Sequence, residues 1–107
     1  MLHEISEIID VVPFQMKLRF DSNEVRQVDF RKIFEDAKKY PQSVFNKLKD
    51  PAVFLNVKFN EEFKIIYWEN LTTYRDLDGK QKAGPLEVSP EYLYEMSIPI
   101  STEKIHH

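Results

Sequence analysis

The stretch FQMKLRFDSNEVRQVDF, residues 14–30, decides the fold. Its first seven residues alternate apolar and polar side chains, which is the period of a strand with one buried face. A polar break at residues 21–23 follows, and Val28 then resumes the apolar pattern. A three-residue loop at 21–23 sets Met16 opposite Val28, so that both apolar sets share one face. The stretch therefore predicts a tight antiparallel hairpin.

The alternative for this hairpin is a four-residue loop, which sets Arg19 opposite Arg26 and turns Val28 to the other face. Like charges directly opposite are destabilising, and the change of face would separate the apolar sets. The tighter loop needs a left-handed residue at Asn23, a conformation that asparagine tolerates. Residues 4–12, EISEIIDVV, form a third candidate strand that ends before a proline.

After the hairpin the apolar residues recur at helical spacing, at Phe30, Ile33, Phe34 and Ala37. Asp29 precedes them as the expected N-cap, and Pro41 interrupts the helix because a residue before proline leaves helical conformation. A second short helix opens at Gln42 or Ser43 and ends at KDPA, residues 49–52. Its apolar stripe comprises Val44, Phe45 and Leu48. We expect a kinked helix pair that packs on the sheet.

Strands are predicted again at residues 54–59, FLNVKF, and 63–70, FKIIYWEN, with a turn between them. The second is apolar on both faces, which is typical of a central strand. Residues 71–85, LTTYRDLDGKQKAGP, are polar and contain the turn signal Asp78-Gly79, so we expect a protruding hairpin or a long loop.

Ser89 followed by Pro90 is typical of a helix start, and we expect a short C-terminal helix at residues 90–96. The predicted fold class is α+β, an antiparallel sheet of about five strands with the kinked helix pair and the C-terminal helix packed on one face. We expect a single domain over residues 1–100 and a disordered tail at 101–107.

Composition excludes several chemistries. The 107 residues contain no cysteine and two glycines, and the net charge is −3. A thiolate metal site, a cysteine nucleophile and a glycine-rich phosphate loop are therefore excluded. The histidines, His3, His106 and His107, lie at the chain ends, so we expect no metal site, no cofactor and no catalytic residue. Mixed charges make nucleic-acid binding unexpected. The longest apolar run is far below the ~20 residues that span a bilayer, and a chain without cysteine fits the cytoplasm, which is the expected location.

Three segments carry a family resemblance: LRFDSNEVRQVDF, VFNKLKDPAVFLNVKFNEEFKIIYWEN and VSPEYLY. Over roughly residues 5 to 96 the chain resembles a bacterial domain-of-unknown-function family, number 2442. The matching positions are Val44, Phe45, Leu48, Asp50, Phe54, Trp68, Asn70, Pro90, Glu91, Leu93 and Tyr94. The chain departs from the family pattern at Asn23, where the family has a turn glycine, and after Asn70, where the family's glycine is missing.

The resemblance implies an α+β fold and supplies no catalytic residue. Some members of that family are labelled as the antitoxin component of toxin–antitoxin pairs, which implies a partner protein that is a cognate toxin. A resemblance of this kind favours binding over chemistry.

Aromatic residues near the C-terminus are the candidate contact and core residues. We expect Trp68, Pro90, Leu93 and Tyr94 to close the core, with Trp68 under the C-terminal helix. Residues two apart on a helix face different ways, so with Tyr94 buried we expect Tyr92 to be exposed. Tyr92 and Tyr74 are the candidate partner-contact residues.

These observations predict a non-catalytic protein-interaction module, antitoxin-like, that acts by binding a partner protein. The arm at residues 71–85 could also form a homo-oligomer by pairing with the sheet edge of a second copy. One alternative is a small-ligand-binding domain or an enzyme based on carboxylates, which a pocket near Trp68 with a buried acid would favour. A nucleic-acid-binding regulator is the third.

Overall fold

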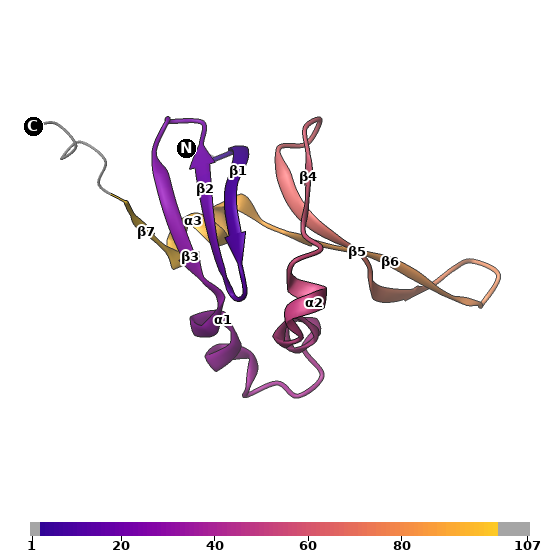
Figure 1. Ribbon diagram of the computed structural model, residues 1–107. Helices are drawn as coiled ribbons and strands as arrows, with labels where there is room; N and C mark the ends of the chain where they lie inside the picture. Colours follow the sequence, from indigo (N-terminus) through magenta and orange to yellow (C-terminus); the bar gives the residue numbers. More distant parts are fainter. Residues whose placement is uncertain (1–2, 101–107) are drawn as a thin grey trace, which may run out of the picture.

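The computed structural model describes residues 3–100 and has two antiparallel sheets with four helical segments (Figure 1). The first sheet has the strand order β1-β2-β3-β7 and the second has the order β4-β5-β6. The strands are β1 (Ile5–Val12), β2 (Gln15–Phe20), β3 (Val25–Asp29), β4 (Lys58–Asn60), β5 (Ile65–Arg75), β6 (Gln81–Val88) and β7 (Ser97–Pro99). The helices are α1 (Phe30–Ala37), the 3-10 helix η1 (Val44–Lys49), α2 (Pro51–Phe54) and α3 (Pro90–Met96). The predicted α+β class is confirmed, with the strands divided between two sheets.

The β2–β3 hairpin has the predicted three-residue loop. Met16 pairs with Val28, and the Phe20 N–H donates to the Glu24 carbonyl at 2.9 Å. Asn23 has a φ of 73°, which is the left-handed conformation that this loop requires. The third candidate strand is also confirmed, because β1 pairs antiparallel with β2.

The first two helical segments begin at residues whose side chains cap the helix N-terminus. Asp29 accepts from the Arg31 N–H at 3.0 Å at the start of α1, and Ser43 accepts from the Phe45 N–H at 3.3 Å at the start of η1. Asp29 is the predicted cap, and Ser43 is one of the two residues predicted to open the second helix; both can satisfy backbone donors that have no partner within the helix.

The predicted strand at residues 54–59 is confirmed only at its end, and its start is wrong. Its first residue ends α2, and only Lys58–Asn60 pairs with β5. The cause lies just upstream: Asp50 accepts from the Ala52 N–H at 3.0 Å, and Pro51 occupies the first helical position, where proline needs no partner for a backbone N–H. The chain therefore forms a helical turn at residues 51–54, and the strand begins only at Lys58.

One buried core joins both sheets and all four helical segments. Its fully buried side chains are Ile5, Met16, Leu18, Phe20, Val28, Phe30, Ile33, Leu48, Phe54, Ile66, Trp68 and Leu93. The edge strand β1 of the first sheet meets the β4–β5 turn of the second where the Ile5 N–H donates to the Lys64 carbonyl at 3.4 Å. Because β2, β3 and β5 supply half of these residues and the helical segments supply five more, the core lies between the sheets and the helices.

The C-terminal helix has the expected bounds, and the chain then adds a strand that the sequence did not predict. α3 is capped by Ser89 and followed directly by β7, which pairs Ser97 with Val28 of β3. Among residues 3–100, no helix is both long and apolar enough to cross a membrane. The predicted tail at 101–107, with His106 and His107, lies outside the described residues.

Candidate functional site

The outer halves of β5 and β6 form an arm, residues 71–85, that projects from the body of the molecule (Figure 1). The molecule measures 61 Å along its longest axis and 30 and 26 Å along the others. At the tip of the arm the Asp76 N–H donates to the Lys80 carbonyl and the Gly79 N–H to the Asp76 carbonyl, each at 2.9 Å. Gly79 has a φ of 81°, so the predicted turn signal is confirmed and the arm is a hairpin.

A bulge in β5 separates the arm from the body. Trp68 pairs with Leu86, but the next pair is Thr72 with Gly84, so three residues of β5, 69–71, lie opposite a single residue, Pro85. Proline has no N–H to donate to a ladder, which makes it suited to a position opposite a bulge. Bulges of this kind bend the strand that carries them.

At the bulge two carbonyl groups accept hydrogen bonds from side chains, and one residue has an unusual torsion angle. Asn70 has a φ of 54°, which asparagine tolerates better than most residues. The Lys47 ammonium donates to the Leu71 carbonyl at 2.9 Å, and the Thr72 hydroxyl donates to the Pro85 carbonyl at 3.2 Å. These contacts hold the arm at its root.

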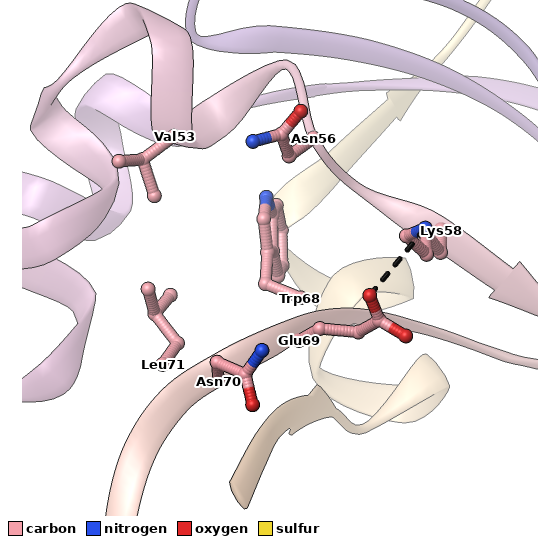
Figure 2. Close-up of a pocket in the computed structure, with 7 residues that line it drawn as sticks. All are labelled: Val53, Asn56, Lys58, Trp68, Glu69, Asn70 and Leu71. Carbon is pink, nitrogen blue, oxygen red and sulfur yellow. Dashed lines mark ion pairs between the residues drawn. The ribbon is translucent and has the colours of Figure 1, made fainter. Parts of the chain in front are cut away.

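A pocket of about 380 Å³ lies beside the bulge (Figure 2). It is lined by Val53, Asn56, Lys58, Trp68, Glu69, Asn70 and Leu71. In Figure 2, Val53 and Asn56 lie on one side, and the β5 residues from Trp68 to Leu71 lie on the other. β4 pairs with β5 only as far as Tyr67, so the pocket occupies the place where a longer β4 would continue.

The chemistry of the pocket suits binding. The Lys58 ammonium lies 3.5 Å from the Glu69 carboxylate, and both side chains are about half exposed. The amides of Asn56 and Asn70 offer hydrogen-bond donors and acceptors beside two aliphatic side chains. The single carboxylate of the lining is thus solvated and paired, whereas a general acid or base needs a perturbed environment. In the described part of the chain, no three His, Asp or Glu side chains are grouped to hold a metal ion.

Trp68 closes the core as expected, but its neighbours differ from the prediction. It is 1% exposed, and its ring centre lies 5.9 Å from those of Phe30 and Phe54. The indole N–H donates to the Phe54 carbonyl at 2.9 Å. The aromatic partners therefore belong to α1 and α2, where the C-terminal helix was expected. That helix buries Leu93 completely, and Pro90 occupies its first position.

The expected contrast between Tyr92 and Tyr94 is wrong, because both side chains are half-buried. Tyr94 lies between two other side chains: its ring stacks on His3 with 3.7 Å between ring centres, and the Arg26 guanidinium lies 4.0 Å from the ring on another side. Its hydroxyl donates to Glu24 at 2.6 Å. Tyr94 thus joins α3 to the N-terminal segment and to β3.

Charged neighbours of this cluster shift its pKa values. The hydrogen bond from the Tyr94 hydroxyl lowers the pKa of Glu24, and the same bond raises the pKa of Tyr94. Glu91 accepts hydrogen bonds from the ring and the backbone of His3, which lower the Glu91 pKa. Sequence reasoning missed this cluster because its members are far apart in the chain, and no local pattern marks them.

The two predicted partner-contact residues lie on different surfaces. Tyr74 is 52% exposed on the arm, and its ring covers Gly84, where an added Cβ would lie 3.3 Å from the ring. Tyr92 borders a shallow apolar hollow of about 210 Å³ between α1, η1 and α3. Burial raises the pKa of Tyr92, and the nearby Asp36 raises it further. The structure therefore does not bring the two tyrosines together.

Comparisons with known proteins give no match to the chain among family models, curated proteins or solved structures.

Proposed function

We propose that the chain is a non-catalytic protein-interaction module that binds an extended segment of a partner protein in the pocket beside the β5 bulge. One observation carries the proposal. β5 spans Ile65–Arg75, whereas β4 pairs only with its first three residues, so a long open edge follows the pocket.

An extended segment suits this place because strand addition uses backbone groups for affinity and side-chain pockets for specificity. A segment that entered beside Lys58 would continue the direction of β4 and lie antiparallel to β5. Its apolar side chains would contact Val53 and Leu71, and its polar groups would meet the amides of Asn56 and Asn70. Lys58 and Glu69 form an exposed ion pair at the rim of the pocket. This pair would favour a register in which the bound segment places an acidic side chain near Lys58 and a basic one near Glu69.

The finer proposal is that the partner is a cognate toxin, as the family resemblance implies. Co-expression with the product of the neighbouring gene tests it, with co-purification and growth rescue as readouts. A partner that neither co-purifies nor is neutralised would contradict the antitoxin assignment.

The pocket itself is tested by filling it. Asn56→Trp places a large ring in the pocket from an exposed position, so we expect partner capture to fall at least tenfold while the fold is kept. Leu55→Trp is the matched control, because Leu55 is its exposed neighbour and does not line the pocket. Equal capture by the two variants would contradict a role for the pocket, and a thermal melt of each checks folding.

Small-ligand binding is the second candidate, and the pocket favours it because about 380 Å³ is within the usual range of ligand sites. Trp68 is the only tryptophan of the chain and lies at this pocket, so its fluorescence reports an occupant directly. A ligand that shifts this fluorescence in the wild type and not in Asn56→Phe, with Leu55→Phe as the control, would support the second candidate. Carboxylate-based catalysis would in addition require turnover that Glu69→Gln abolishes.

A nucleic-acid-binding role is the third candidate, and the net charge of −3 does not favour it. Salt-sensitive retention of the protein on DNA would support it, and no retention at low salt would exclude it.

A further inference from the structure

The arm, residues 71–85, buries almost none of its side chains within one chain. Gly84 is the only buried residue of the segment 71–85, and Leu77 at the tip is fully exposed. A two-stranded hairpin alone in water is marginally stable, and a third strand or an apolar partner is the usual remedy. The arm thus combines an exposed leucine, a half-exposed Tyr74 and two strand edges.

Hydrogen-bond alternation identifies the groups that point away from the hairpin. Asp76 and Lys80 are a hydrogen-bonded pair, and such pairs alternate with non-bonded pairs along an antiparallel ladder. Arg75 and Thr73 therefore belong to non-bonded pairs, and their N–H and C=O groups point outward from β5. The same alternation directs the backbone groups of Gln81 and Ala83 outward from β6.

The two edges differ in their capacity to accept a further strand. The next outward position on β6 is Pro85, which has no N–H, and proline is a residue that protects sheet edges. The β5 edge has no proline from Leu71 to Arg75, and β4 ends before reaching it. The β5 edge is therefore the open one.

We infer that this edge pairs with the same edge of a second copy, so that two arms form a four-stranded antiparallel sheet about a two-fold axis. The inference rests on the proposed function in that it names a partner for the outer part of the same edge. The second copy pairs with β5 from Leu71 outward, so a partner segment in the pocket ends at Leu71, the residue that the two contacts share. A two-fold contact of this kind closes on itself and forms a dimer instead of a fibre.

The charges and apolar groups select one register. A two-fold axis at Arg75 would set the two Arg75 side chains opposite each other, which is unfavourable. An axis at Thr73 would set Leu71 opposite Arg75 and leave Leu77 outside the sheet. An axis at Tyr74 sets Tyr74 opposite its counterpart and Leu71 opposite Leu77, with no like charges facing. This third register is the one that we infer.

Single-cysteine crosslinking tests the register, because the natural chain contains no thiol. In the inferred dimer the two Tyr74 residues form a non-hydrogen-bonded pair with Cα atoms about 4.5 Å apart, which a disulfide can span. We expect Tyr74→Cys to give a covalent dimer on mild oxidation at least tenfold faster than Leu77→Cys, although Leu77 is the more exposed. Fastest crosslinking by Thr73→Cys or Arg75→Cys would overturn the register.

Light scattering tests the dimer itself, with an expected mass of about twice the chain mass of 12.8 kDa. Thr73→Pro removes an outward N–H from the open edge and should give a monomer, whereas Ala83→Pro removes one from the other edge and should remain a dimer. A monomeric wild type at high concentration would overturn the inference and leave the pocket experiment unaffected. A wild-type dimer that captures no partner would contradict the proposed function and leave the inference standing.

Discussion

The β2–β3 hairpin and the β5–β6 arm have the same turn and different surroundings. In each, a backbone N–H donates to the carbonyl four residues later, and the fourth residue of the turn, Asn23 or Gly79, is left-handed. β2 nevertheless buries Met16, Leu18 and Phe20 almost completely, whereas the arm buries only Gly84. Local hydrogen bonds therefore specify a hairpin, and burial decides whether that hairpin belongs to the core.

The two hairpins also differ in how much they stabilise the fold and in whether they leave a strand edge open for binding. Burial of large apolar side chains is the main source of folding free energy, so the first hairpin is tied to the stability of the whole domain. The arm contributes little to that stability, and its edge remains open. Because the arm is not needed for the core, its open edge can pair with another strand.

The largest difference between the two hairpins should be seen in the free energy of unfolding when a core side chain is truncated. Phe20→Ala removes a fully buried ring and should reduce the free energy of unfolding by about 3–5 kcal/mol. Tyr74→Ala, on the arm and two residues further from its turn than Phe20 is from its own, should change it by less than about 1 kcal/mol because half of that ring is already exposed. Urea unfolding followed by Trp68 fluorescence measures both, and equal losses would show that the arm belongs to the core.

Replacing Asn23 should destabilise the whole domain, whereas replacing Gly79 should destabilise only the arm. Alanine in this conformation costs about 1 kcal/mol, so Asn23→Ala should lower the global free energy of unfolding by about that amount. Gly79→Ala carries a similar local penalty, but amide hydrogen exchange should rise only within the arm. Asn23→Gly is the control and should be close to neutral. A global loss in Gly79→Ala would contradict the separation.

Acidic pH should reduce the stability of the domain in part by protonating Glu24. Its pKa is lowered in the folded state, so the stability that it contributes is present above its ordinary value of 4.5 and is lost as the pH falls through the lower folded value. Glu24→Gln should therefore weaken the dependence of stability on pH below 4.5 by a small amount, because the side chain is 39% exposed and solvent screens its interactions. Unfolding midpoints between neutral pH and pH 3 measure this, with Glu4→Gln, whose side chain is also exposed, as the control. An unchanged slope would contradict the role of the Tyr94–Glu24 bond.

Several features of the fold could be predicted because their causes are local. The parity of the pairing between Met16 and Val28 follows from two short apolar patterns and one loop. The start of α3 follows from Ser89-Pro90. The same signature, Asp50-Pro51, starts α2, but the alternating residues after it favoured a strand. In that segment two local signals competed, and the cap with proline prevailed.

Less of the candidate site could be predicted. The exposure of Tyr74 and the protruding arm follow from a polar sequence with a turn signal. The pocket depends on a bulge opposite Pro85 and on the early end of β4, neither of which leaves a distinct periodic pattern. The stacking of His3 on Tyr94 joins residues from opposite ends of the chain.

The sequence alone specifies the turns at 21–23 and 78–79, the caps Asp29 and Ser89, the parity of the first hairpin and the absence of thiol and glycine-loop chemistry. These properties depend on neighbouring residues and on residue types alone. Only the tertiary structure decided the division into two sheets, the neighbours of Trp68 and the open edge beside the pocket. The physical reason is that burial and strand pairing depend on residues distant in sequence, which compete for the same partners until the core is formed.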